Sequence, residues 1–175
     1  MTDSPTGTVH ASAVLVGDRA VLIRGPSGSG KSRLAFDLIL AGRTGQIPPA
    51  VLVGDDRVHL DTGGGNLMVR PARELAGLIE IRGLGIRRID HAGEASVGLV
   101  VDLAAADAER LPPPVALLVR ISGVLIPRIP VRAGFEPLPL IAAALTTTEG
   151  SGLDQLSADC PKGIGNHISP TIATE

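Results

Sequence analysis

The residues best suited to chemistry form one short stretch, Gly-Pro-Ser-Gly-Ser-Gly-Lys-Ser. It matches the phosphate-binding loop (P-loop) pattern G-x-x-x-x-G-K-[ST] at every specified position. Its glycines allow a backbone path along which successive N–H groups point at phosphate oxygens. Its lysine can reach the β- and γ-phosphates, and its last serine can ligate Mg²⁺. The stretch therefore predicts binding of a nucleoside triphosphate and Mg²⁺ by Gly25, Pro26, Ser27, Gly28, Ser29, Gly30, Lys31 and Ser32.

The motif has this meaning only where a strand precedes it and a helix follows. Residues 20–23 are a short apolar run, as in a buried strand, and apolar residues between 34 and 39 follow at helical spacing. Gly42 is the expected end of that helix. The Gly-Asp-Arg turn at residues 17–19 joins residues 20–23 to an earlier strand over 9–16, which predicts an antiparallel hairpin.

A P-loop needs a carboxylate close to the metal and the attacking hydroxyl, and two positions compete for this role. Asp102 follows the apolar run 97–101, as the acid of a Walker B strand does. Asp55 and Asp56 follow the run 50–53 and offer two adjacent carboxylates. Neighbouring side chains on a strand point to opposite faces, so only one of the pair can face the γ-phosphate directly. The local pattern leaves the choice between the two positions open.

Composition narrows the class of protein. A length of 175 residues suits one domain, and 44% hydrophobic but only 1% aromatic residues predict an aliphatic core. The scarcity of aromatic side chains and the net charge of −2 argue against nucleic acid as a partner. Cys160 is the only cysteine, which excludes an internal disulfide. The polar start of the chain and the lack of an apolar run of about 20 residues predict a cytoplasmic protein.

The rest of the chain reads as many short strands and few helices, which predicts an α/β domain with a mixed sheet. Strands are expected over 50–53, 57–60, 66–69, 97–101, 115–121, 124–126 and 128–131. Residues 104–110 permit a helix, and a final helix is expected over 138–145. We expect one catalytic domain over 1–145 and a flexible C-terminal tail over 146–175, where the sequence loses its periodicity.

Three features together resemble the HPr kinase/phosphorylase family, bacterial enzymes that phosphorylate a serine of the phosphocarrier protein HPr. They are Val9-His10-Ala11 upstream of the P-loop, the Asp55-Asp56 pair, and Leu-Ile-Glu-Ile-Arg-Gly-Leu-Gly-Ile over 78–86, which is nearly the family signature. The resemblance runs from about residue 9 to 135 and covers only the catalytic domain.

This resemblance favours the Asp55-Asp56 position and implies further roles. Lys31 would hold the phosphates, and Ser32 with Glu80 would hold Mg²⁺. Asp55 would take the proton of the substrate serine, with His10 beside it to orient it. The family also implies a P-loop fold similar to the nucleotide domain of phosphoenolpyruvate carboxykinases, and assembly as a hexamer.

Arg110 aligns with a family arginine that can neutralise charge on the transferred phosphoryl group. One late loop departs from the family pattern Pro-Val-Arg/Lys-x-Gly-Arg-Asn, which is tied to the dephosphorylation reaction. In this chain, Phe135 and Glu136 replace the Arg-Asn pair. The loss of a cation that could bind the attacking phosphate puts the reverse reaction in doubt.

The leading hypothesis is therefore an ATP- and Mg²⁺-dependent serine kinase that acts on HPr, with phosphate-dependent release of pyrophosphate left open. A small-molecule kinase using the same site is the first alternative. An ATP-sensing regulator with little turnover is the second. The residues His10, Asp55 and Glu80 argue against a pure sensor, which has no need of a base.

Overall fold

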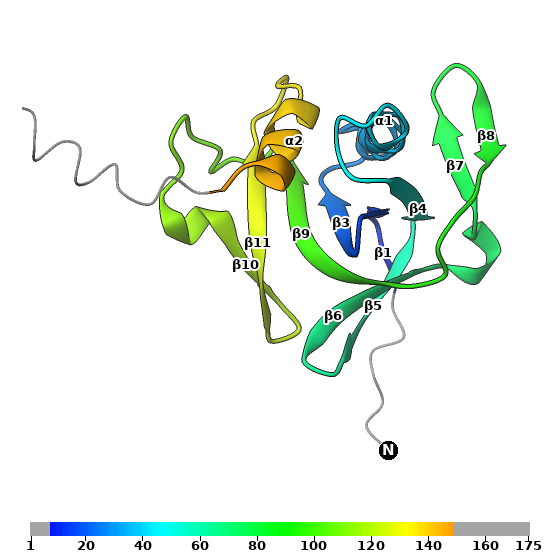
Figure 1. Ribbon diagram of the computed structural model, residues 1–175, viewed down its shortest axis with the longest axis horizontal. Coiled ribbons are helices and arrows are strands. Elements are labelled where there is room, and N and C mark those ends of the chain that lie inside the picture. The colour runs from blue at the N-terminus through cyan, green and yellow to red at the C-terminus, as the bar shows by residue number, and fades with distance from the viewer. Residues whose placement is uncertain (1–7, 149–175) are drawn as a thin grey trace, which may run out of the picture.

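A curled, mixed β-sheet lies at the centre of the structure, a computed structural model that describes residues 8–148 (Figure 1). Two α-helices, α1 (Lys31–Arg43) and α2 (Leu138–Thr146), lie on one side of it. Two 3₁₀ turns, η1 (Arg73–Leu75) and η2 (Pro114–Leu117), connect strands. The strands are β1 (Thr8–Val9), β2 (Ser12–Val16), β3 (Arg19–Arg24), β4 (Ala50–Gly54), β5 (Val58–Gly63), β6 (Asn66–Pro71), β7 (Leu78–Ile81), β8 (Gly85–Arg88), β9 (Ala95–Leu103), β10 (Leu118–Ile121) and β11 (Val124–Val131).

The strand order explains how distant segments reach one edge of the sheet. The order is β1-β5-β6-β9-β3-β2-β4, with the β10–β11 hairpin joined along β9 and the β7–β8 hairpin separate. β3, β9 and β11 run parallel. β2 is antiparallel to both β3 and β4, so β4 runs in the same direction as β3. The carboxyl ends of four strands and the start of β2 therefore lie at the same edge.

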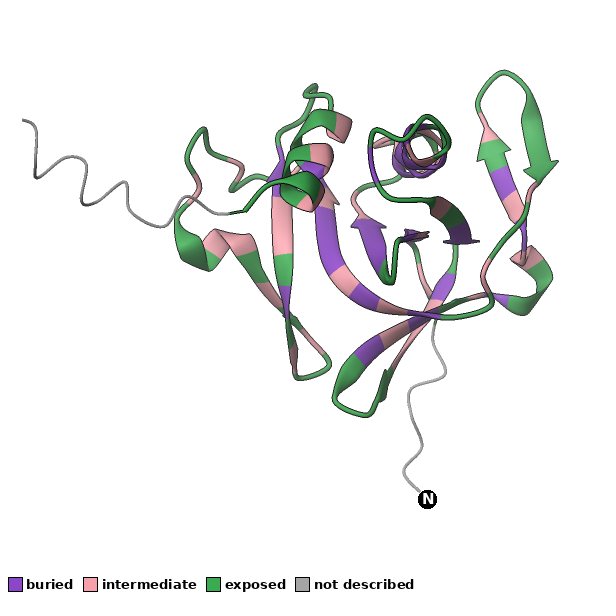
Figure 2. Cartoon of the chain, in the orientation of Figure 1, coloured by how far each residue is buried: buried purple, intermediate pink, exposed green. Residues whose placement is uncertain are grey.

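The alternation of side chains along the central strands produces two apolar cores, one on each face of the sheet. On β3, Val21 and Ile23 pack under α1 and α2, while Ala20 and Leu22 face the opposite core. The second core is closed by side chains of β5, β6, β10 and β11. Figure 2 shows the buried residues concentrated on β3, β9 and the inner side of α1. The cores are almost wholly aliphatic, as the composition predicts.

The predicted strand over 9–16 is interrupted at its second residue. Thr8 and Val9 pair with β5, whereas Ser12 begins a separate strand that pairs with β3 and β4. The chain changes partners at His10, which lies in a bend between the two strands. The predicted hairpin between β2 and β3 is confirmed.

The helix that residues 104–110 permit does not form, so that expectation was wrong. The segment is a series of turns and bends, and Ala104 has a left-handed φ of 56°. Asp107 accepts hydrogen bonds from both terminal nitrogens of Arg128 on β11, at 2.6 and 2.9 Å. This long-range pair holds the segment against the sheet, and its helical propensity is too weak to prevail.

Most other predicted elements are present, with shifted ends. The first half of the strand expected over 115–121 is the turn η2, and the strands expected over 124–126 and 128–131 are one continuous strand, β11. The helix α1 passes Gly42 and ends at Arg43. The expected tail lies almost entirely outside the described residues. Within residues 8–148, no helix is long and apolar enough to cross a membrane.

Candidate active site

The sheet brings the chemically capable residues together at one edge. The P-loop follows β3, the Asp55-Asp56 pair follows β4, and His10 precedes β2. The carboxyl ends of parallel strands are where α/β sheets bind their ligands. Residues that lie far apart in the sequence therefore face a common space.

The P-loop has a conformation that depends on its glycines. Gly25 has a φ of 150°, and a Cβ atom there would lie 2.7 Å from Ser29 Oγ and 3.0 Å from the Leu103 carbonyl oxygen. Gly30 has a φ of 95° and precedes the first helical residue, Lys31. Lys31 and Ser32 thus stand in the first turn of α1, where the N–H groups and the helix dipole favour an anion.

Lys31 is held over the loop by the backbone. Its side-chain nitrogen donates to the carbonyl oxygens of Gly25 and Pro26, each at 3.0 Å, and the residue is only 6% exposed. Ser29 Oγ is buried and has no hydrogen-bond partner among the described residues. A buried hydroxyl without a partner is costly. A phosphate oxygen bound in the loop is the partner that the position suits.

The two adjacent aspartates have different surroundings. Asp55 is 3% exposed, and its oxygens accept hydrogen bonds from Ser12 Oγ at 2.6 Å and from the Glu80 N–H at 3.1 Å. Asp56 has a left-handed φ of 65°, which turns its carboxylate into the open cavity. His10 Nε2 lies 3.2 Å from Asp56 Oδ1. The sequence predicts His10 beside Asp55, and the structure places its imidazole in contact with the adjacent carboxylate, Asp56.

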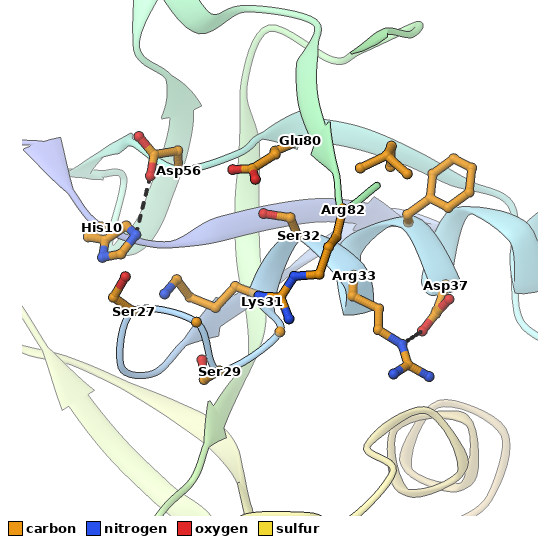
Figure 3. Close-up of a pocket in the computed structure, with 14 residues that line it drawn as sticks. His10, Ser27, Ser29, Lys31, Ser32, Arg33, Asp37, Asp56, Glu80 and Arg82 are labelled. Carbon is orange, nitrogen blue, oxygen red and sulfur yellow. Dashed lines mark ion pairs between the residues drawn. The ribbon is translucent and has the colours of Figure 1, made fainter. Parts of the chain in front are cut away.

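A single cavity of about 620 Å³ is lined by His10, Asp56, Glu80, Lys31 and Ser32, while Asp55 lies outside its lining. Figure 3 shows Glu80 and Asp56 on one side of it, with Ser32 and Lys31 opposite them on the P-loop and the first turn of α1. Arg82, inside the signature stretch, also lines the cavity. Glu80 comes from β7, which packs beside α1. Asp55 fixes the position of Glu80 through the hydrogen bond to its N–H group.

Asp102, the competing acid, is bound by two arginines and does not take part in the site. Arg24 binds it with two hydrogen bonds of 2.7 and 2.8 Å, and Arg128 Nε donates a third at 2.5 Å. Burial works to raise the pKa of Asp102, but the two arginines outweigh it and the pKa is lowered. Asp102 does not line the cavity that holds Lys31 and Ser32. From its position on β9, Asp102 links β3, the strand before the P-loop, to β11.

Arg110 is exposed and lies outside the residues that line this cavity. The family resemblance assigned Arg110 to the site of phosphoryl transfer, but the structure does not bring its side chain to this cavity. Conversely, Arg33 and Asp37 on α1 line the cavity and were not expected to do so. Burial raises the pKa of Asp37, aided by Glu136 and opposed by Arg33. Their helical spacing of four residues on the helix after the P-loop is the signal that could have found them.

The residues fit a nucleotide with Mg²⁺. The glycine-rich loop, the buried lysine and the unpartnered Ser29 hydroxyl suit a triphosphate. Ser32 and Glu80 offer the oxygen ligands that Mg²⁺ prefers. No group of three acidic, histidine or cysteine residues stands ready for a metal within residues 8–148. Magnesium needs no such group where phosphate oxygens complete its shell.

Comparison with known proteins identifies the family and agrees with the fold. Residues 3–151 match the family described as the HPr serine kinase C-terminal domain. An HPr kinase/phosphorylase of Bordetella pertussis is 40% identical over 62% of this chain and 37% of its own length. One from Mycoplasma mycoides is 37% identical over 57% of this chain and 32% of its own. The solved structure of the Hpr(Ser) kinase/phosphatase from Coxiella burnetii matches with a TM-score of 0.63 and 27% identity, over 80% of this chain and 93% of that one.

The fold and the site define a P-loop nucleotide-binding domain built on a mixed sheet. Within that class, the chain belongs to the HPr serine kinase C-terminal domain family. It spans about a third of the length of these curated relatives, 32% and 37% respectively.

Proposed function

We propose that this chain is a protein-serine kinase that transfers the γ-phosphoryl group of ATP to a serine of an HPr-type phosphocarrier. One observation carries the proposal. A single cavity joins the P-loop lysine and serine with Glu80 and with the His10–Asp56 pair. The names of the relatives point to the same acceptor.

The phosphate side of the site would work by positioning and electrostatics. Lys31 and the N–H groups at the start of α1 would hold the phosphates. Ser32 and Glu80 would hold Mg²⁺, which when bound neutralises charge that develops on the transferred group. The cavity wall formed by Glu80 and Arg82 closes the site on the side of the β7–β8 hairpin.

We assign the general base to the aspartate pair, and the geometry favours Asp56 over Asp55. Asp56 is open to the cavity, while both oxygens of Asp55 already accept hydrogen bonds. The serine oxygen would attack the γ-phosphorus as its proton passes to the Asp56 carboxylate. The bond to the β,γ-bridging oxygen breaks, and ADP leaves. His10 would hold the Asp56 carboxylate in the orientation that receives the proton.

The residues of one loop argue against the reverse reaction, in which inorganic phosphate attacks the phosphoserine and pyrophosphate is released. Glu136 follows Phe135 in the loop where the family pattern has Arg-Asn, and a carboxylate repels inorganic phosphate. We therefore propose that phosphate-dependent release of pyrophosphate is impaired. A cytoplasmic location and self-association, as a hexamer by family resemblance, stay predictions.

The test is to incubate the protein with Mg-ATP and HPr-type phosphocarriers, and to search for phosphoserine by mass spectrometry. Phosphoserine that disappears with Lys31→Ala supports the proposal. If carriers remain unmodified while free hydroxyl metabolites are phosphorylated, the small-molecule kinase takes its place. If ATP binds and is not hydrolysed or transferred, the protein is instead an ATP-sensing regulator. Adding phosphate to the phosphorylated carrier and measuring pyrophosphate tests the reverse reaction.

A further inference from the structure

A second cavity of about 360 Å³ opens on the other side of the P-loop. It shares Gly28, Ser29, Gly30, Arg33 and Asp37 with the first cavity, so the two cavities are neighbours on either side of these residues. Its remaining walls come from Leu34 on α1, from the carboxyl end of β9, and from residues 131–137, which run from the end of β11 to α2. The wall residues include Leu103, Val131, Phe135 and Pro137.

The two cavities lie on opposite sides of the P-loop. The groups suited to the γ-phosphoryl end, Asp56 and Glu80, lie on the side of β4 and β7. The second cavity lies on the side of β9 and β11, across β3 from β4. A nucleoside triphosphate is a chain with the reacting phosphate at one end and the nucleoside at the other. With its γ end in the first cavity, its nucleoside end points to the second.

Phe135 is the notable side chain of the second cavity. The chain has two phenylalanines and no Trp or Tyr, yet Phe135 is 63% exposed. Its N–H donates to the Arg132 carbonyl at 3.1 Å, in a turn where Gly134 has a φ of 83°. The neighbouring Glu136 accepts a hydrogen bond of 3.4 Å from Arg33 on α1. The loop is thus tied to the helix that follows the P-loop, with an aromatic ring at the rim of the cavity.

We propose that the second cavity holds the nucleoside of ATP and that Phe135 is the surface on which the base stacks. The proposal deepens the proposed function and rests on it for the identity of the nucleotide. An aromatic ring binds the face of a base without reading its edge.

The test compares ATP with inorganic tripolyphosphate, which has the phosphates and lacks the nucleoside. Isothermal titration calorimetry is carried out with Mg²⁺ on the wild type and on Phe135→Ala. We expect Phe135→Ala to weaken ATP binding about tenfold and to leave tripolyphosphate binding unchanged. Leu125→Ala, which truncates a 52% exposed side chain on the β10–β11 hairpin, is the matched control and should change neither.

Phe135→Trp adds a second, spectroscopic readout, because the wild-type chain contains no tryptophan and the introduced residue would be the only one. We expect it to retain ATP affinity, and we expect ATP but not tripolyphosphate to change its fluorescence. Equal loss of both ligands in Phe135→Ala overturns the proposal, as does unchanged ATP affinity with weaker phosphorylation of the carrier, which would assign Phe135 to the protein substrate. The proposed function fails separately, if wild-type protein binds ATP through Phe135 and yields no phosphoserine.

Discussion

At the scale of single residues, the site depends on the unequal roles of two adjacent aspartates. Asp55 is buried and joins Ser12 to the backbone of Glu80, so it supports the walls of the cavity. Asp56 faces the cavity and pairs with His10. A left-handed backbone at Asp56 costs free energy and is common at functional sites. Asp55 therefore has a structural role, and its neighbour Asp56 is the one placed to react.

This division predicts different outcomes for two matched variants. Asp56→Asn should lower kcat at least about a hundredfold, since general base catalysis contributes on the order of 10²–10⁴. ATP affinity and the melting temperature should stay close to the wild type. Asp55→Asn turns an amide N–H₂ toward donors that need an acceptor, so it should lower stability by roughly 1–3 kcal/mol and weaken Mg²⁺ binding through Glu80.

Steady-state kinetics, calorimetry and denaturant titration of both variants separate the two roles. Lost turnover with normal stability in Asp55→Asn, together with an active Asp56→Asn, would return the role of base to Asp55. That result would support the role implied by the family resemblance, and it would contradict the geometric argument.

At the scale of elements, the clamp on Asp102 connects three parallel strands behind the P-loop. Arg24 ends β3, Asp102 lies in β9, and Arg128 lies in β11. Arg128 also binds Asp107, and this contact, together with Asp102, raises the pKa of Arg128 and keeps it charged. A clamp at the end of β3 positions the loop that leaves this strand. A sequence pattern typical of a Walker B acid has here become a structural ion pair.

The clamp predicts a pH dependence of stability. The folded-state pKa of Asp102 is lowered below its ordinary value of 3.8, so the carboxylate stabilises the fold fully above that value. This contribution is lost as the pH falls below 3.8 and passes through the lowered pKa. Urea titrations from pH 7 to pH 2.5 should therefore show a steeper loss of stability in the wild type than in Asp102→Asn. Parallel pH profiles for the two proteins would contradict the assignment.

These elements also mark the limit of prediction from sequence. The strand, loop and helix over residues 19–43 were predictable because their signals are local, as are turn glycines and helical spacing. The failed helix at 104–110 and the commitment of Asp102 depend on Arg128, which no local pattern connects to them. The orientation of the aspartate pair depends on one backbone angle, at Asp56. The motif located the site, whereas tertiary contacts decided which acid faces it.

At the scale of the whole molecule, several exposed apolar side chains close together on one segment are a candidate contact with other proteins. Leu111 is 83% exposed and Val115 is 80% exposed, and Leu118 follows them on the same segment. None of the three lines either cavity described above. A contact between copies at this segment would therefore leave the site open.

We predict that the protein self-associates and that this segment takes part. Replacing both Leu111 and Val115 by Glu should shift sedimentation toward the monomer, because charges would then have to be buried at the contact. ATP affinity, measured by calorimetry, serves as the control for intact folding. An unchanged assembly in the double variant would place the contact elsewhere, and a monomeric wild type would remove the prediction altogether.

The nucleotide should act on the molecule as a whole, because it would touch three segments that lie far apart in the sequence and would add contacts between them. The P-loop, Glu80 on β7 and the loop before α2 all face the two cavities. A ligand that binds only the folded state, at a hundred times its dissociation constant, stabilises it by about 2.7 kcal/mol. For a domain of this size, we expect Mg-ATP to raise the melting temperature by roughly 5–10 °C. Lys31→Ala should abolish the shift and EDTA should reduce it, and an equal shift in Lys31→Ala would mean that ATP binds away from the P-loop.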